Sequence, residues 1–289
     1  MGVKGIVLAG GKATRLYPVT KAVCKQLLPV YDKPLVYYPL SVLLLAGIRD
    51  ILLITLPEVK KQFKSLLGDG KQLGISIYYE EQKMPGGIGE AFIIGEDFIS
   101  KERVCLILGD NIFYGHGLGE QLNIAMKCKE GAQIFAYYVS NPHRYGVLEF
   151  DEKGRVVAIE EKPKIPKSKW VVTGLYFYDN EVISIAKSVK PSLRNELEIT
   201  DINRVYLERG KLKVSFLGRG YAWLDIGTPE ALIEASMFIK AIEDRQGLKV
   251  GCIEEIVYRL GYITKEQLLK LTQSMGTAYF EYLKQIAQG

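Results

Sequence analysis

A glycine-rich turn followed by an arginine is the first segment of the chain whose residue types suit chemistry. Residues 8–16 read LAGGKATRL, so Gly10 and Gly11 follow residues 5–9, which we expect to form a buried strand, and Arg15 comes four residues after the pair. A glycine pair lets the backbone turn sharply and expose its N–H groups, and these donors together with a guanidinium group form a cradle for a triphosphate. A tight turn with a solvated arginine has the same residues, so the loop alone leaves both interpretations open.

Two common phosphate-binding motifs do not fit this loop. A P-loop has a glycine five residues before its Gly-Lys pair and a serine or threonine after it, and Ile6 and Ala13 occupy these positions. The dinucleotide fingerprint G-x-G-x-x-G does not occur here either. The loop is therefore of another kind, and a second cation, Lys25, follows Arg15 by ten residues and lies between two prolines.

Two aspartates that follow apolar runs are candidates for a metal site. Asp110 comes after residues 104–108 and Asp225 directly after residues 221–224. Open α/β sheets bind their ligands at the carboxyl ends of strands, and Mg2+ takes hard oxygen ligands, commonly one or two carboxylates with phosphate and water oxygens. An isolated aspartate is more often a turn or capping residue, but the surrounding motifs favour a metal ligand at both positions.

The elements that must position these side chains alternate over the first 140 residues. Short apolar runs predict strands at residues 5–9, 50–55, 75–80, 104–108 and 132–139. Amphipathic stretches between them predict helices at residues 40–46, 58–67, 88–99 and 118–129. This alternation is typical of βαβ units and predicts the α/β class, with a Rossmann-like, mostly parallel sheet flanked by helices.

The pattern changes after about residue 140. Residues 146–150 and 156–160 flank a DEKG turn, which indicates a hairpin, and further strands are predicted at 171–178 and 212–216 with a helix at 202–208. From residue 229 onward the pattern is helical. We expect one domain over residues 1–289, with an α/β part over 1–140, a small β-rich part over 141–228 and a helical C-terminal tail over 229–289.

Composition argues against several classes of protein. The net charge is +5, but Lys and Arg are spread along the 289 residues, whereas nucleic-acid binders usually concentrate their basic residues. The four cysteines lie far apart and there are two histidines, which disfavours zinc ligation and a Cys–His nucleophilic pair. Dispersed thiols suit a reducing cytoplasm, and no apolar run reaches membrane-spanning length or has the form of a signal peptide. We expect a cytoplasmic protein without nucleic-acid or membrane partners.

Ordered motifs along most of the chain resemble those of the sugar nucleotidyltransferase family. Residues 11–20 (GKATRLYPVT) and 25–29 (KQLLP) are similar to its signatures G-x-G-T-R-L-x-P-x-T and K-x-L-L-P. Residues 25–34 (KQLLPVYDKP) look like the branch of the family that transfers thymidylyl groups to glucose 1-phosphate. Further matches occur at residues 66–70, 108–116, 144–147, 160–163, 172–178, 196–201 and 218–228, and about the last 30 residues match weakly.

The resemblance implies an enzyme that uses Mg2+ to join a nucleoside triphosphate, with dTTP favoured, to glucose 1-phosphate. Arg15 and Lys25 would be the catalytic cations, and Asp110 and Asp225 the metal ligands. The nucleotide would be bound by Leu8, Gly10, Gly11, Thr14, Arg15, Lys25, Gln26, Gln82, Gly87 and Asp110. The sugar phosphate would be bound by Tyr145, Gly146, Glu161, Lys162, Val172 and Arg194.

The same resemblance implies a homotetramer and the first step of a dTDP-sugar pathway such as dTDP-rhamnose synthesis. Residues 1–140 would then be the nucleotide-binding part and 141–228 the sugar-binding part. A uridylyltransferase or an enzyme that accepts both dTTP and UTP stays open, because the two nucleotides differ by a methyl group and a hydroxyl. A nucleotide-sugar sensor without turnover is a further alternative, which intact Arg15, Lys25, Asp110 and Asp225 disfavour.

Three positions depart from the family pattern. Ala13 replaces the third glycine of the phosphate loop, and we expect the loop to adopt a conformation without the positive φ that strains alanine by about 1 kcal/mol. Gly86 replaces an aspartate before Gly87, and Glu90 replaces a glutamine just beyond. These two changes bear on nucleotide preference more than on the type of reaction.

Overall fold

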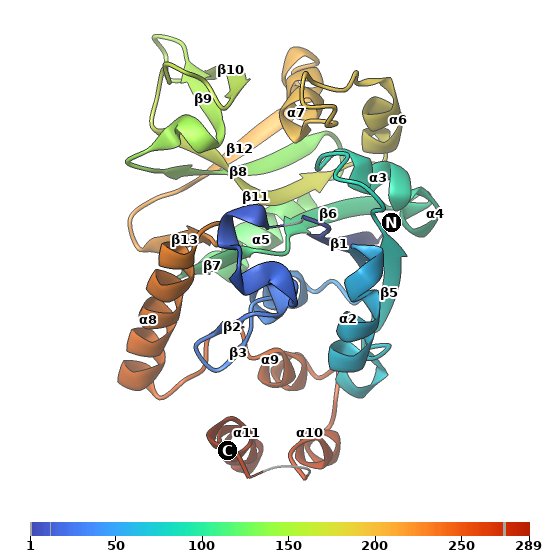
Figure 1. Cartoon of the computed structure of the whole chain (residues 1–289), viewed down its shortest axis with the longest axis vertical. Helices are drawn as coiled ribbons and strands as arrows, with labels where there is room; N and C mark the ends of the chain where they lie inside the picture. The colour runs from blue at the N-terminus through green and yellow to red at the C-terminus, as the bar shows by residue number, and fades with distance from the viewer. Residues whose placement is uncertain (1, 12, 274–275) are drawn as a thin grey trace.

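The computed structural model describes residues 2–11, 13–273 and 276–289 (Figure 1). A sheet crosses the middle of the molecule between helices, a hairpin and two helices lie at the top of the view, and the last three helices lie at the bottom. Among the described residues, none of the helices has both the length and the apolar character that crossing a membrane requires.

Parallel strands form the centre of the sheet. Strand β1 (Val3–Ala9) pairs with β4 (Asp50–Thr55) on one side and with β6 (Arg103–Leu108) on the other, and β5 (Ser76–Glu81) pairs with β4. The side chains of successive β1 residues point to opposite faces of the sheet, so that Ile6 packs into one hydrophobic core and Val7 into the other. A strand covered on both faces reads as a continuous apolar run, which is why residues 5–9 show no alternation.

Antiparallel pairing extends the sheet beyond β6. Strand β11 (Trp170–Tyr178) pairs antiparallel with β6, β8 (Ala132–Tyr138) and β9 (Gly146–Phe150). Strands β9 and β10 (Val156–Glu161) form the hairpin at the top of Figure 1, and β12 (Leu212–Leu217) runs parallel to β8. The main path is β10-β9-β11-β6-β1-β4-β5.

Helices cover the two faces of this sheet. One core contains side chains from α1 (Tyr37–Leu45), α2 (Lys60–Leu67) and α5 (Leu118–Lys127). The other core contains side chains from α3 (Glu90–Ile94), α4 (Glu96–Ile99), α6 (Glu181–Ser188) and α7 (Ile199–Glu208). Both layers are apolar on the side that meets the sheet, as an α/β domain requires.

A separate two-stranded sheet joins distant parts of the chain. Strand β7 (Asn111–Gly115), which follows β6 almost directly, pairs antiparallel with β13 (Tyr221–Asp225), so that Asp225 lies opposite Asn111. Helix α8 (Pro229–Gln246) begins after β13, where the Thr228 side chain accepts a hydrogen bond from the Ala231 N–H at 3.3 Å. This pairing fixes the end of β13 beside the end of β6.

Charged residues attach the C-terminal tail, which contains α9 (Ile253–Arg259), α10 (Lys265–Leu271) and α11 (Ala278–Gln288). Strands β2 (Pro29–Val30) and β3 (Lys33–Pro34) form a short hairpin whose Lys33 ammonium donates to Glu243 of α8 at 3.0 Å and also to Asp32. Lys249, just before α9, donates to the same two carboxylates.

The predicted α/β class, the mostly parallel sheet and the helical C-terminal tail are confirmed. The single helix predicted over residues 88–99 is wrong, because α3 and α4 are separated at Gly95. A Cβ at Gly95 would lie 3.0 Å from the Ala91 carbonyl oxygen and 3.1 Å from the Ile6 side chain, so any larger residue at this break would fit tightly against β1.

Candidate active site

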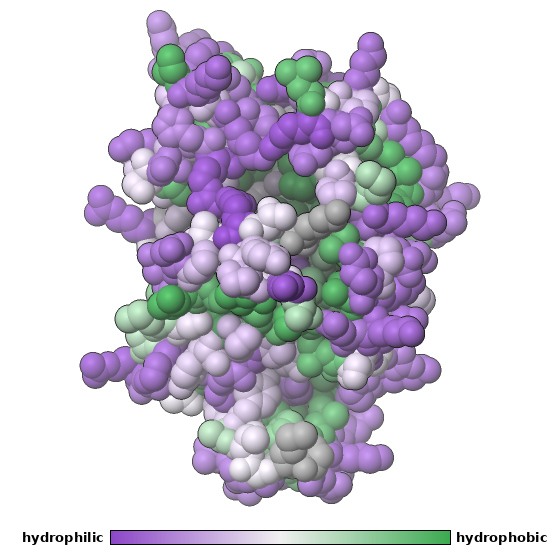
Figure 2. Space-filling model, viewed as in Figure 1, coloured by the Kyte–Doolittle hydropathy of each residue, from purple (hydrophilic) through white to green (hydrophobic). Residues whose placement is uncertain are grey.

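A cavity of about 820 Å³ lies at the carboxyl ends of the central strands. Leu8 near the end of β1 and Leu108 at the end of β6 line it, and the hairpin β9–β10 contributes Gly146 and Glu161. Figure 2 shows the hollow in the upper half of the molecule, with hydrophilic side chains around a more apolar floor. Parallel sheets bind ligands at this edge, where the strands end and loops begin.

The structure brings every residue of the site predicted from sequence to this one cavity. Its lining includes Leu8, Gly10, Gly11, Thr14, Arg15, Lys25, Gln26, Gln82, Gly87, Asp110, Tyr145, Gly146, Glu161, Lys162, Val172, Arg194 and Asp225. The residues predicted for the nucleotide come from the ends of β1, β5 and β6 and from the loops after β1, and those predicted for the sugar phosphate come from β9, β10, β11 and the segment before α7.

The glycine-rich loop leads from β1 into a short 3-10 helix, η1 (Thr14–Leu16), which carries Arg15. A Cβ at Gly10 would lie 2.1 Å from Oε1 of Gln82, so no other residue fits there without moving that amide. No described atom lies within 4 Å of a Cβ built at Gly11, which leaves the backbone open to a ligand.

The expected conformation of Ala13 is wrong. Its backbone has φ 49° and ψ 41°, in the left-handed region, where an alanine is strained by about 1 kcal/mol or more. The Ala13 carbonyl accepts hydrogen bonds from the Leu16 N–H and from the Thr20 hydroxyl, both at 3.0 Å. These two bonds stabilise the turn that presents Arg15, which is the physical reason that the strained conformation persists.

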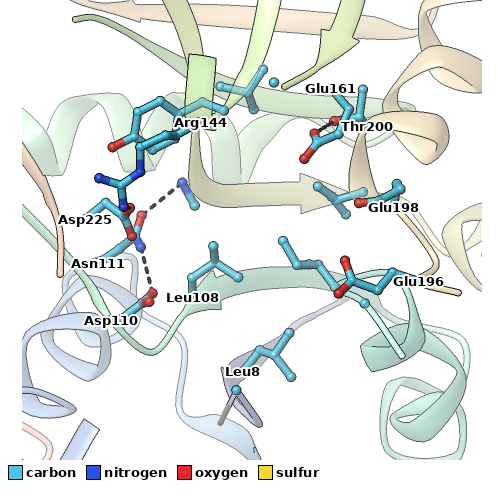
Figure 3. A pocket seen from close by; sticks show the side chains of 18 of the residues that line it. Leu8, Leu108, Asp110, Asn111, Arg144, Glu161, Glu196, Glu198, Thr200 and Asp225 are labelled. Carbon is cyan, nitrogen blue, oxygen red and sulfur yellow. Dashed lines mark hydrogen bonds and ion pairs between the residues drawn. The ribbon is translucent and has the colours of Figure 1, made fainter. Parts of the chain in front are cut away.

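Lys25 and Asp110 meet at the base of the cavity. Lys25 begins the 3-10 helix η3 (Lys25–Leu27), and its ammonium group donates a hydrogen bond to the Asp110 carboxylate. Asn111 holds the other oxygen of that carboxylate through its Nδ2, at 2.9 Å. The Oδ1 of Asn111 accepts from the Gly174 N–H at 3.1 Å and from the Trp223 indole at 2.7 Å, so Asn111 is fixed from three sides (Figure 3).

Asp225 faces this group from the end of β13. The pairing of β13 with β7 places it opposite Asn111, and the next residue, Ile226, donates its N–H to the Asp110 carbonyl at 3.0 Å. Burial raises the pKa of Asp225 to about 6, and the negative charge of Asp110 adds to the effect. Asp225 is thus held in a buried position close to the negative charge of Asp110.

Arg144 is a site residue that the sequence analysis did not assign. Its guanidinium group lies 3.9 Å from the Asp225 carboxylate, as the labelled pair in Figure 3 shows. A Cβ at Gly227 would lie 2.9 Å from Nη2 of Arg144 and 3.1 Å from Nη2 of Arg15, so the two arginines meet over this glycine. Arg144 lies in a matched motif directly before Tyr145, and that neighbour was the available signal.

The opposite wall of the cavity carries carboxylates and a hydroxyl. Glu161 ends β10 opposite Gly146 of β9, and it accepts a hydrogen bond from Thr200 of α7 (Figure 3). The Lys162 ammonium nitrogen lies 3.4 Å from Oε1 of Glu161, and Nη2 of Arg194 lies 3.6 Å from the same oxygen. These two cations flank a carboxylate that faces the cavity.

Further residues line the cavity that the sequence analysis did not assign to it. They include Glu196, Glu198, Thr200, Trp223, His143 and Tyr176. Arg194 donates to Glu198 at 2.8 Å, and Thr200 follows two residues later at the start of α7. Tyr176 of β11 is buried and also forms part of the cavity wall. The sequence spacing of such single polar residues does not distinguish them from polar residues on a solvent-exposed surface.

The arrangement fits a divalent cation and a polyphosphate. The two aspartates offer hard carboxylate oxygens of the kind that Mg2+ binds, and burial, followed by the charge of Asp110, raises the pKa of Asp225. Lys25, Arg15 and Arg144 surround the pair, and the glycine-rich loop adjoins it. Such a site can bring two anions together and stabilise charge on a phosphoryl group.

Comparison with known proteins gives a consistent result. The family model described as "Nucleotidyl transferase" matches residues 4–242. The glucose-1-phosphate thymidylyltransferase of Neisseria meningitidis serogroup A is 57% identical over 282 residues, which cover 97% of this chain and 98% of that protein. The glucose-1-phosphate thymidylyltransferase of Mycolicibacterium smegmatis is 55% identical over 285 residues, which cover 98% of this chain and 99% of that protein.

A solved structure from Bacillus anthracis, assigned as a glucose-1-phosphate thymidylyltransferase and holding sucrose, has a similar fold. Its TM-score is 0.76 at 42% sequence identity, over 82% of this chain and 95% of that chain. Similarity therefore extends over nearly the full length in sequence and over most of the chain in structure.

Proposed function

The chain belongs to the nucleotidyl transferase family, and from this premise we propose that it transfers a thymidylyl group from dTTP to α-D-glucose 1-phosphate, giving dTDP-glucose and pyrophosphate. The observation that carries the proposal is the convergence of Arg15, Lys25, Asp110 and Asp225 on one cavity beside a glycine-rich loop. Relatives that match nearly the whole chain are named as glucose-1-phosphate thymidylyltransferases, and this supports the choice of substrates.

The reaction needs positioning and charge stabilisation more than acid–base chemistry. An ionised phosphate oxygen of glucose 1-phosphate attacks the α-phosphorus of dTTP, and the bond from that phosphorus to pyrophosphate breaks in line. Arg15 neutralises the triphosphate, and Lys25 contacts the α-phosphoryl group on which charge develops. The loop at Gly10, Gly11 and Thr14 supplies N–H donors to the phosphates.

We further propose Mg2+ as the metal, which Asp110 and Asp225 would hold through their carboxylate oxygens. When bound, it would supply positive charge that offsets the negative charge of the phosphates. Asn111 orients Asp110 through the hydrogen bond at 2.9 Å, and β7–β13 pairing holds Asp225 in place. Arg144 adds a further positive charge beside Asp225.

The base and the sugar occupy opposite sides of the cavity in this proposal. Leu8, Gln26, Gln82 and Gly87 bind the nucleoside. Glu161 accepts hydrogen bonds from glucose hydroxyls, Lys162 and Arg194 hold the sugar phosphate, and Tyr145, Gly146 and Val172 complete the wall. Residues 1–140 thus act as the nucleotide-binding part and residues 141–228 as the sugar-binding part.

The same proposal includes the location, the oligomeric state and the pathway of the enzyme. The enzyme would act in the cytoplasm as a homotetramer and would begin a dTDP-sugar pathway such as dTDP-rhamnose synthesis. A uridylyltransferase or dual-specificity enzyme is less well supported, because relatives that are 57% and 55% identical are named for the thymidylyl group. A sensor that binds a nucleotide sugar without turnover does not require two metal-binding carboxylates beside Lys25.

The test is an assay of the full chain with dTTP, glucose 1-phosphate and Mg2+. We expect pyrophosphate release with formation of dTDP-glucose, and a higher kcat/KM for dTTP than for UTP. An equal or higher kcat/KM for UTP would overturn the nucleotide assignment. Nucleotide binding without pyrophosphate release from any nucleotide and sugar 1-phosphate would overturn the enzymatic proposal.

A further inference from the structure

The side chain of Gln82, at the end of the cavity near the glycine-rich loop, is fixed by Glu90 of α3. Its Nε2 donates to the Glu90 carboxylate at 2.7 Å and to the Gly87 carbonyl at 3.1 Å. Its Oε1 lies over Gly10, 2.1 Å from where a Cβ would be, and both residues line the cavity. Gln82 is buried, with 4% of its surface exposed, so this amide has little freedom to turn.

Glu90 determines which end of the amide faces the cavity. An ionised carboxylate can only accept hydrogen bonds, and so can the Gly87 carbonyl. Both partners therefore require the NH2 end of Gln82, which leaves Oε1 as the atom presented over Gly10. A glutamine at position 90 would impose no such choice, because its own amide can donate or accept.

Gly86 provides the space for this arrangement. A Cβ at Gly86 would lie 2.3 Å from Oε2 of Glu90 and 2.5 Å from its carboxyl carbon. The backbone of Gly86 is not in the left-handed region, so its conformation does not itself demand glycine. Any side chain here would displace the Glu90 carboxylate from Gln82. Gly86 and Glu90 are also two of the positions at which the sequence departs from the family pattern.

We propose that Glu90 is a positioning residue for base selection, which locks Gln82 with its carbonyl oxygen toward the nucleobase and depends on glycine at position 86. This inference rests on the proposed function. It specifies a nucleobase with an N–H donor at the edge that faces Oε1 of Gln82. Thymine and uracil present N3–H there, whereas cytosine presents N3 as an acceptor and would face Oε1 with like polarity. Sites built around a hydrogen bond strongly reject analogues that lack it.

Equilibrium binding tests the inference independently of turnover. Calorimetry would measure the Kd values of dTTP, UTP and dCTP with Mg2+ for the wild-type chain and for Glu90→Gln. We expect E90Q to raise the Kd values of dTTP and UTP about tenfold each, because a charge-assisted hydrogen bond is replaced by a neutral one. The Kd of dCTP should stay within about twofold of its wild-type value. The ratio of dTTP to UTP should not change, since both bases share the N3–H edge. At saturating dTTP, kcat should stay within about twofold.

A second variant separates orientation from fold. Gly86→Asp should weaken dTTP at least as much as E90Q does, and the double variant G86D/E90Q should bind dTTP more tightly than G86D, because an amide accommodates the new carboxylate. Glu96→Gln, at a partly exposed site on α4 whose carboxylate pairs with Lys187, is the matched control and should leave all three Kd values unchanged. The inference is wrong if E90Q keeps the wild-type ratio of dTTP to dCTP, or if E90Q fails to rescue G86D. If E90Q shifts the ratio of dTTP to dCTP as expected but the wild type releases no pyrophosphate, the result would count against the proposed function alone.

Discussion

The ammonium group of Lys25 donates a hydrogen bond to the carboxylate of Asp110, although 85 positions separate the two residues. Lys25 lies in the loops after β1, and Asp110 lies just past the end of β6, the strand paired with β1. The parallel pairing therefore brings a cation and a candidate metal ligand to one point.

Asn111→Asp should weaken metal binding without changing the shape of the side chain. The variant loses the Nδ2 donor at 2.9 Å from Asp110 and places a like charge there. Loss of such a supporting hydrogen bond typically costs about 10–100-fold in metal affinity. Titration of activity with Mg2+ measures the shift. Asn123→Asp, an exposed site on α5 with the same charge change, serves as the control and should titrate like the wild type.

Asp225→Asn should separate stability from activity. We expect turnover to fall about 100-fold or more because a metal ligand is lost, while the metal-free protein becomes more stable by about 1–3 kcal/mol because a buried like charge is removed. Thermal melts in EDTA and pyrophosphate assays measure the two effects. Asp244→Asn on the exposed side of α8 should change neither by much. A destabilised D225N would show that the carboxylate pair is not repulsive.

Much of the fold follows from the sequence because its signals are local. Continuous apolar runs predict β1, β4 and β6, since a strand covered on both faces needs no polar side. The pairing of β7 with β13 gives no such signal, because it joins Asn111 to Asp225 across the chain and depends on the complete fold. The break between α3 and α4 at Gly95 is likewise not predicted, because a single glycine within an apolar, helix-like stretch does not by itself indicate where a helix ends.

The candidate site divides in the same way. Asp110 was predictable because it follows a buried strand, and Arg15 and Lys25 because their motifs are distinctive. Arg144 and Thr200 lie in matched segments, but their residue types alone do not indicate a role, because an arginine or threonine next to a loop is most often solvated. Ala13 shows the reverse case, in which a local rule predicted a relaxed conformation and two hydrogen bonds to its carbonyl maintain a strained one.

Asp32→Asn should destabilise the protein at neutral pH and much less in acid. Burial alone would raise the pKa of Asp32, but hydrogen bonds from Lys249 and Lys33 outweigh it and hold the pKa below its ordinary value. A lowered pKa contributes stability that is present above the unfolded value near 4 and is lost as the pH falls through the folded value. The loss at pH 7 should be about 1–2 kcal/mol, because Asp32 accepts hydrogen bonds from charged groups but is partly exposed, so that water screens them.

Urea unfolding of the wild type and D32N at pH 7 and near pH 3 checks this expectation. The difference between their midpoints should shrink in acid. Asp69→Asn provides the comparison, because Asp69 is exposed and pairs with an exposed Lys71, so its effect should stay below about 1 kcal/mol. A D32N effect that is equal at both pH values would show that ionisation of Asp32 does not contribute to attachment of the tail.

The most direct test of the account is the turnover of Lys25→Met compared with Lys21→Met. Lys21 ends the neighbouring 3-10 helix η2 (Val19–Lys21) and is exposed, whereas Lys25 is buried against Asp110. With dTTP, glucose 1-phosphate and Mg2+ at saturation, we expect kcat for pyrophosphate release to fall about 100-fold or more in K25M and to stay within about twofold in K21M, with both variants folded by circular dichroism. A folded K25M that retained more than about a third of wild-type kcat would contradict the claim that this cation acts on the reacting phosphoryl group.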